Sequence, residues 1–140
     1  MTAPTATPLE AHVELHRQAV LSHPSTQAFW EAAGRGVLLL PRCAGCGKHH
    51  WYPRPFCPFC HSTQIEQVPA SGRGRLYACS ALEREQPHNI VAYVELEEGP
   101  MLLTNLIDCT LDEASIGAAV TVAFSPLASG YHLPVFRLRR

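Results

Sequence analysis

The chain has 140 residues, enough for one domain of ordinary size with a small appendage and too few for two full enzyme domains. Apolar residues make up 46% and charged residues 16%, which excludes a disordered chain, and a formal net charge of −1 argues against a protein built throughout to neutralise nucleic-acid phosphates. No window approaches the roughly 20 apolar residues of a membrane-spanning helix and the start lacks an export signal, so we expect a cytoplasmic protein.

Two short helices are expected in an N-terminal extension over residues 1–36. A capping box at residues 7–10 starts the first helix, which should run to about residue 22. Its apolar stripe is narrow, so this helix must dock either on its own domain or on a partner. Pro24 then breaks the chain, and Ser25 can cap a second helix over 26–33.

Residues 37–70 hold four of the six cysteines, several prolines and little helical periodicity, so we interpret them as a small unit that a metal organises. From residue 71 to 140 the pattern changes to alternating runs rich in β-branched and aromatic residues. Five strands are expected, over 74–82, 89–97, 101–108, 119–125 and 134–138.

The order of these strands favours a closed barrel. Gly99-Pro100 forces a turn, so the second and third strands should form an antiparallel hairpin. A small helix over 111–116 would plug one end of the barrel, as in a five-stranded Greek-key barrel. We therefore expect a mainly β protein: short N-terminal helices, a zinc ribbon and a five-stranded OB-fold.

Two Cys-x-x-Cys pairs carry the clearest chemistry. Cys43 and Cys46 form the first, Cys57 and Cys60 the second, and ten residues separate the pairs. This spacing lets four thiolates surround one tetrahedral Zn²⁺, and four protein ligands leave no open position, so the metal should be structural. Iron in a rubredoxin-like site is the other metal to consider, and a pair of disulfides is disfavoured in a reducing compartment.

The other two cysteines and the histidines near the ribbon are not expected to bind the metal. Cys79 and Cys109 lie in or after expected strands, and we expect buried thiols that behave as small hydrophobes. His49, His50 and His61 flank the cysteines and should shape the rim of the metal site rather than bind the ion.

The sequence resembles the DUF35 family, also called the acyl-CoA-associated zinc-ribbon/OB-fold proteins. The resemblance covers roughly residues 25–138, and His61 departs from it, since many relatives have glycine there. The motifs that carry it are Phe29-Trp30-Glu31-Ala32-Ala33-Gly34, Leu39-Leu40-Pro41-Arg42-Cys43-Ala44-Gly45-Cys46-Gly47, Tyr52-Pro53-Arg54, Cys57-Pro58-Phe59-Cys60, Gly72-Arg73-Gly74, Val91-Ala92-Tyr93-Val94-Glu95-Leu96, Gly99-Pro100-Met101-Leu102-Leu103-Thr104-Asn105-Leu106, Ile116-Gly117 and Leu133-Pro134-Val135-Phe136.

This resemblance implies a rubredoxin-like zinc ribbon and an OB-fold in a stand-alone accessory subunit that lacks catalytic residues of its own. Such subunits form hetero-oligomers with thiolases, ketoacyl-synthase-like condensing enzymes, lipid-transfer-type aldolases or enoyl-CoA hydratases. The resemblance therefore implies a partner of the thiolase superfamily, or a related acyl-CoA enzyme, with the acyl-CoA at the shared interface.

The charge distribution suggests where coenzyme A would be held. Residues 35–75 contain six basic residues against one acid, Glu66. Arg42, Lys48 and Arg54 could meet the phosphates, while Trp51 and Tyr52 could stack on adenine or else cover the core of the ribbon.

Two further hypotheses stay open. Phe29 and Trp30 could anchor the partner enzyme, or could pack internally against the ribbon. A nucleic-acid-binding module is the other class of function, because zinc ribbons and OB-folds are common in that role. The acids near residues 83–98, among them Glu95 and Glu97, disfavour it because they repel a phosphate backbone.

Overall fold

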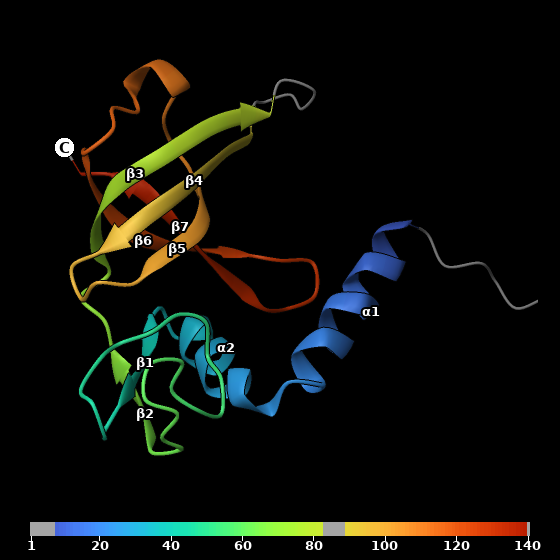
Figure 1. Ribbon diagram of the computed structural model, residues 1–140. Coiled ribbons are helices and arrows are strands. Elements are labelled where there is room, and N and C mark those ends of the chain that lie inside the picture. The colour runs from blue at the N-terminus through green and yellow to red at the C-terminus, as the bar shows by residue number, and fades with distance from the viewer. Residues whose placement is uncertain (1–7, 83–88, 140) are drawn as a thin grey trace, which may run out of the picture.

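The computed structural model describes residues 8–82 and 89–139. Figure 1 shows a helical N-terminal part, a small two-stranded ribbon and a barrel. The first helix, α1 (Pro8–Leu21), ends as the sequence predicts, while Thr7 of its predicted capping box lies outside the described residues. No helix of the described segments is long and apolar enough to span a membrane.

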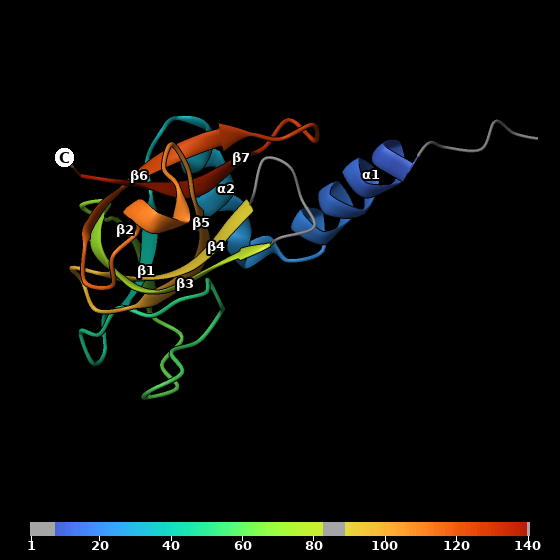
Figure 2. The ribbon, with the colours of Figure 1, turned by 90° about the horizontal axis from the view of Figure 1, so that it is seen from above.

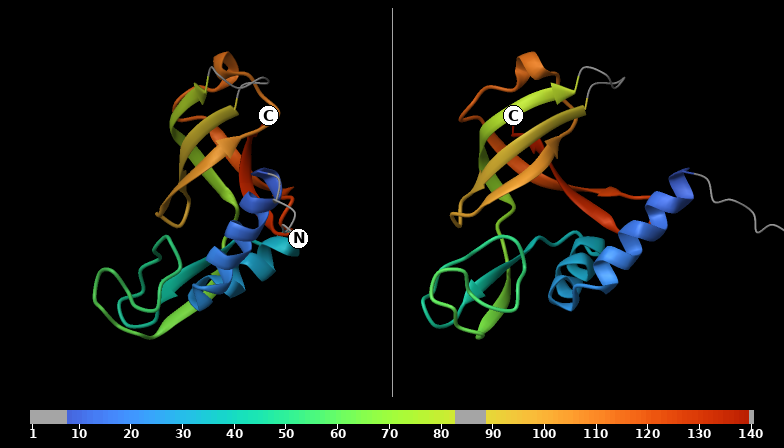
Figure 3. Two further views of the ribbon diagram at one scale, coloured as in Figure 1. Left: turned by 90° about the vertical axis from the view of Figure 1, so that its right-hand side faces the viewer. Right: turned by 45° about the vertical axis from the view of Figure 1, so that its right-hand side comes forward.

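Helix α1 projects from the body of the molecule as an arm (Figure 1, Figure 3). His16 Nδ1 lies 2.9 Å from Ser129 Oγ, and Arg17 Nε donates to the Ser129 carbonyl at 2.9 Å. Val20 is buried, whereas Leu15 is 62% exposed. Leu15 lies on another side of the helix from Val20, so docking on its own domain leaves this apolar side chain uncovered. The view from above shows the arm leading away from the barrel (Figure 2).

The second helix begins with a tighter turn than predicted. A 3₁₀ turn, η1 (Pro24–Thr26), leads directly into α2 (Gln27–Gly34). The predicted cap, Ser25, lies inside η1, and Thr26 takes the N-cap position instead. Thr26 Oγ1 donates to the His23 carbonyl at 2.8 Å and does not cap the helix, because the 3₁₀ turn already satisfies this junction.

The ribbon contains a sheet that the sequence pattern does not reveal. Strand β1 (Leu39–Cys43) pairs antiparallel with β2 (Ile65–Pro69), with Leu40 opposite Val68. Neither strand alternates cleanly between apolar and polar residues, and β1 contains Pro41. A proline is tolerated here because both strands of a two-stranded sheet are edge strands.

The barrel has the five predicted strands. They are β3 (Arg73–Leu82), β4 (Asn89–Leu96), β5 (Met101–Leu106), β6 (Ala119–Pro126) and β7 (His132–Leu138). They close in the order β3-β4-β5-β7-β6, and β4 and β5 form the predicted antiparallel hairpin. All neighbouring pairs are antiparallel except β5 and β7, which meet at Leu106 and Phe136. This closed five-stranded order is that of an OB-fold.

Alternating side chains fill the barrel. On β4, Ile90, Ala92, Val94 and Leu96 are buried, as the period-2 pattern predicts. The predicted helix over 111–116 is a single 3₁₀ turn, η2 (Leu111–Glu113), at the barrel end that faces away from the ribbon (Figure 1). The Glu113 carboxylate accepts from the Thr110 N–H at 3.1 Å and caps the start of this turn, which ends after Glu113 because the backbone of Ala114 is extended.

The ribbon and the barrel meet at a junction that needs glycine. A β-carbon on Gly72 would lie 2.5 Å from Val122 Cγ1, and one on Gly74 would lie 2.5 Å from the Glu95 carbonyl oxygen. Beside them, the Ser71 N–H donates to Glu98 Oε2 at 2.8 Å. The turn between β4 and β5 is thereby held against the ribbon.

Candidate metal centre and adjoining pocket

Two similar turns, which we call knuckles, hold the four predicted metal ligands. Cys43 and Cys46 lie in the first knuckle, and Cys57 and Cys60 lie in the second. The Gly47 N–H donates to the Cys43 carbonyl at 2.8 Å, and the His61 N–H donates to the Cys57 carbonyl at 2.9 Å. Gly47 and His61 both have a positive φ, +77° and +65°. The His61 departure from the family pattern therefore leaves the second turn intact, since histidine adopts the left-handed conformation that glycine adopts in the first.

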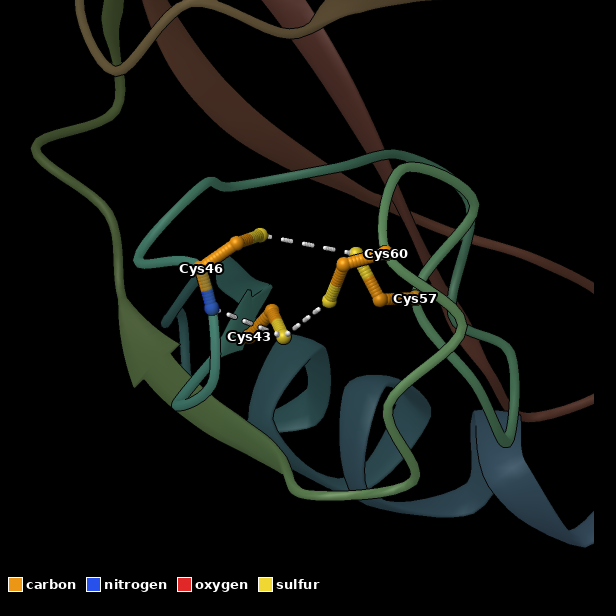
Figure 4. Close-up of side chains that lie close together, drawn as sticks. All are labelled: Cys43, Cys46, Cys57 and Cys60. Carbon is orange, nitrogen blue, oxygen red and sulfur yellow. Dashed lines mark hydrogen bonds between the residues drawn. The ribbon is translucent and has the colours of Figure 1, made fainter.

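The four sulfurs converge on one point (Figure 4). All lie within 4.8 Å of one another, with Cys43 Sγ 3.5 Å from Cys60 Sγ and Cys46 Sγ 3.7 Å from Cys57 Sγ. A Zn–S bond of about 2.3 Å places sulfurs about 3.8 Å apart in a regular tetrahedron. A disulfide needs about 2.0 Å, and all four cysteines are free. The set therefore fits a tetrahedral metal ion and not two disulfides.

Backbone N–H groups favour thiolates in this cluster. The Cys46 N–H points at Cys43 Sγ, 3.5 Å away, and lowers the pKa of Cys43 to about 6. Burial opposes ionisation of Cys57, yet backbone N–H groups of its knuckle keep the pKa of this thiol below its usual value. The Ser62 N–H favours the Cys60 thiolate, but neighbouring sulfurs and burial raise the pKa of Cys60 to about 11. A bound cation would supply the charge that lets all four ionise.

The predicted rim histidines occupy different environments. His50 is 2% exposed, and neither of its ring nitrogens has a hydrogen-bond partner. Burial, with a contribution from Arg54, lowers the pKa of His50, so the ring is neutral at pH 7. His49 is half-buried and His61 is exposed. Among the described residues, only the four knuckle cysteines form a metal-binding group.

Three of the predicted coenzyme A contacts line one pocket. Lys48, Trp51 and Arg54 face a pocket of about 570 Å³ between the ribbon and the turn that joins β4 to β5. His50 and Phe59 also line it, and Lys48 Nζ lies 4.9 Å from the centre of the Phe59 ring. The sequence analysis assigns His50 to the rim of the metal site but gives Phe59 no role, although Phe59 lies between two of the predicted metal ligands, Cys57 and Cys60.

The other two predicted contacts lie elsewhere. Arg42 on β1 pairs with Glu66 on β2 at 3.3 Å and does not line the pocket. Tyr52, 38% exposed, does not line this pocket and instead lines two apolar grooves next to α2. The structure therefore brings part of the predicted set together in one pocket, called the cationic pocket because Lys48 and Arg54 outweigh the one carboxylate in its lining, Glu98.

The predicted interface anchors are buried within this chain. Phe29 is 2% and Trp30 9% exposed. The ring of Phe29 lies 5.1 Å from Trp51 and 6.1 Å from Tyr52, and Trp51 lies 5.0 Å from Tyr52. This aromatic cluster joins α2 to the ribbon, as the internal-packing alternative expects, and a role at a partner interface stays a prediction.

The two cysteines outside the ribbon are less buried than predicted, although both pack against the core as small apolar side chains. Cys79 on β3 and Cys109 after β5 are half-buried against the barrel core. Neither belongs to the metal-binding group.

A four-cysteine ribbon followed by a closed five-stranded barrel defines the class of zinc-ribbon/OB-fold proteins. Family models agree: residues 30–66 match the "ChsH2, rubredoxin-like zinc ribbon domain", and residues 67–125 match the "ChsH2, C-terminal OB-fold domain". A "DUF35 domain-containing scaffold protein" of Methanocaldococcus jannaschii is 32% identical over 98 residues, which cover 64% of this chain and 69% of the relative. The chain belongs to the DUF35 family, with domains of the ChsH2 type.

Further similarities extend this result. A "Probable enoyl-CoA hydratase alpha subunit" of Thermomonospora curvata is 38% identical over 79% of this chain, but the match spans only 36% of that relative. Among solved structures, a chain of the "Ltp2-ChsH2(DUF35) aldolase" has a TM-score of 0.73 and 33% identity, covering 81% of this chain and 94% of that one. A DUF35 protein of unknown function from Sulfolobus solfataricus shares the fold, with a TM-score of 0.63 and 12% identity, covering 96% of this chain and 100% of that one.

Proposed function

We propose that the chain is a non-catalytic accessory subunit of an acyl-CoA-processing complex, paired with a thiolase-superfamily enzyme that makes or breaks a carbon–carbon bond. The observation that carries this proposal is the likeness to a chain of the "Ltp2-ChsH2(DUF35) aldolase" over 94% of that chain's length. The relatives described as scaffold proteins support the same role. We place the complex in the cytoplasm, where thiols stay reduced and free to bind metal.

The chemistry of this chain's own residues suits such a role. The four knuckle thiols are directed at one another, which suits metal ligands rather than free nucleophiles. We therefore assign bond-making to the partner enzyme and a structural role to the cysteines. Zn²⁺ is the metal we propose, held by Cys43, Cys46, Cys57 and Cys60, and its function is to hold the ribbon folded.

We further propose that the ribbon contacts the acyl-CoA at the shared interface. Lys48 and Arg54 line the pocket next to the ribbon and could bind phosphate oxygens through charge-assisted hydrogen bonds. Trp51 lines the same pocket and offers an aromatic surface for the adenine. Arg42 and Tyr52 flank this region, and their contribution is expected to be smaller.

An enoyl-CoA hydratase is the second candidate for the partner. The supporting observation is the relative of Thermomonospora curvata, which is 38% identical to this chain. Most of that relative lies outside the matched region. Its name therefore suggests which kind of enzyme could be the partner, and it assigns no catalysis to the residues of this chain.

Co-purification separates these proposals. The chain, produced with a thiolase-superfamily aldolase or with a hydratase encoded beside it, is expected to elute with one of them as a stable hetero-oligomer. Lys48→Ala/Arg54→Ala should keep the complex but raise the KM for acyl-CoA at least about tenfold, the loss expected for about one charge-assisted hydrogen bond. Salt-sensitive retention on DNA or RNA, with no bound acyl-CoA enzyme, would support the nucleic-acid alternative instead.

A further inference from the structure

An exposed apolar row crosses the outer side of three barrel strands. Tyr77 on β3, Tyr93 on β4 and Leu103 on β5 are 58%, 45% and 59% exposed. Tyr93 lies opposite Leu103 in the register, and it pairs with Ala78, next to the irregularity at which Tyr77 turns outward. The solvent face of an antiparallel sheet is ordinarily polar, so large apolar side chains side by side indicate a surface that another molecule covers.

The row continues into a groove at the foot of the barrel. Leu103 also lines an apolar groove of about 270 Å³, together with Tyr52 from the ribbon and Leu133 from β7. The row and the groove thus form one continuous surface, which we call the apolar tract. It is defined by Tyr77, Tyr93, Leu103, Tyr52 and Leu133.

Charge decides what kind of molecule fits this tract. The defining side chains are all neutral, and Arg75, on the ribbon side of the row, donates to the Gly117 carbonyl and lies opposite Glu95. A nucleic acid would need cations along its phosphates, and the described residues of the tract supply none. Tyrosines and aliphatic residues free of charge are typical of the centre of a protein–protein interface.

The neighbourhood of the tract indicates which protein. Met101 and Leu103 are successive outward residues of β5, 38% and 59% exposed. Met101 lines the cationic pocket of Lys48 and Arg54, while Leu103 belongs to the tract. A protein seated on the tract therefore borders a pocket suited to phosphates, which an enzyme carrying a phosphorylated thioester ligand would use and a second copy of this chain would not.

We propose that the apolar tract is the surface on which the acyl-CoA enzyme docks, with one aliphatic or aromatic side chain of the enzyme inserted into the groove. The identity of the partner rests on the proposed function. Phe29 and Trp30 form the floor of the groove, so they support the interface from beneath and make little of its exposed area.

Binding measurements on the full-length chain test this proposal. Leu103→Asp should weaken the dissociation constant for the partner enzyme at least about 100-fold in calorimetry, and Leu103→Ala about tenfold, because each removes a central apolar contact. Ile116→Asp is the matched control: Ile116 is 66% exposed and follows η2, so its effect should stay within twofold. Metal content and circular dichroism establish that each variant is folded.

Three results would overturn the proposal. A Leu103→Asp complex as tight as the wild type would show that the enzyme docks elsewhere, while the accessory function stands. Wild-type dimers that dissociate in Leu103→Asp would assign the tract to a second copy. Failure of the wild type to bind any acyl-CoA enzyme would remove the proposed function first, and this docking assignment with it.

Discussion

At the residue scale, two knuckles of the same geometry are closed by different residues. Gly47 and His61 hold equivalent positions, and both have left-handed backbone conformations. For a residue with a β-carbon, that conformation costs about 1–2 kcal/mol, whereas glycine adopts it freely. The second knuckle is therefore the more strained of the two.

Replacing His61 with glycine should relieve this strain. We expect His61→Gly to raise the free energy of unfolding of the metal-bound protein by up to about 1 kcal/mol, since the gain is partly offset by the greater freedom of glycine in the unfolded chain. A urea titration measures this change in the free energy of unfolding. Gly47→Ala is the opposite substitution in the first knuckle, and it should lower the free energy of unfolding by about 1–2 kcal/mol. A His61→Gly protein less stable than the wild type would contradict this interpretation.

The metal ligands could be predicted from single residues because Cys-x-x-Cys spacing already dictates how two sulfurs face one ion. The pocket beside them was only partly predictable. Lys48, Trp51 and Arg54 were found from charge and aromatic character, but Met101 belongs to a distant hairpin, and only the folded chain shows that it faces the ribbon. The sequence groups Arg42 with them because it is a nearby basic residue. Only the folded chain shows that Arg42 pairs with Glu66 across the ribbon sheet.

At the element scale, the two sheets are stabilised differently. The barrel closes on itself around buried side chains such as Val94 and Phe136. Strands β1 and β2 pair only with each other, and an isolated two-stranded sheet is marginal in water. Besides the packing of Leu40 in the core, a metal bound by the four cysteines would therefore supply much of the folding free energy of the ribbon.

Removal of the metal should unfold the ribbon and leave the barrel folded. After chelation, we expect the amides of Leu40 and Val68 to lose at least about 100-fold of their protection against hydrogen exchange, while Val94 and Phe136 stay protected. Cys43→Ser/Cys46→Ser should show the same pattern and contain no zinc. Retained protection of the ribbon in the metal-free protein would contradict the structural role.

The glycine junction offers a second prediction at this scale. Gly74→Ala should destabilise the protein by about 2–3 kcal/mol, because the new methyl group would meet the Glu95 carbonyl oxygen and force β3 and β4 apart. Gly34→Ala is the control, since its β-carbon would lie 3.9 Å from His132 Nδ1, at an ordinary contact distance. Thermal unfolding compares them, and equal melting temperatures would refute the packing argument.

Strand prediction succeeded where burial alternates and failed where it does not. On β4 every second residue from Ile90 to Leu96 is buried, so period-2 reasoning finds the strand. The ribbon strands lack this alternation because their folding depends on sulfur ligands rather than on a one-sided core. The element predicted over 111–116 is only one turn, η2, because the backbone of Ala114 leaves the helical conformation directly after Glu113.

At the scale of the whole molecule, the way the ribbon and the barrel are joined suits the proposed role as a subunit that binds another protein. The Ser71–Glu98 hydrogen bond ties the turn between β4 and β5 to the segment that connects the ribbon with the barrel, and the aromatic contact of Phe29 with Trp51 ties α2 to the ribbon. The apolar tract and the cationic pocket then meet at β5, and α1 extends outward from the same body (Figure 1). Binding surface and ligand pocket are thus held in one fixed relation.

The most direct measurement is acyl-CoA turnover by the chain alone, by the partner enzyme alone and by the two mixed at equal concentration. We expect the metal-loaded chain to show no turnover by itself and to raise the activity of the partner enzyme when the complex forms. Turnover by the purified chain without any partner would contradict the claim that it is an accessory subunit.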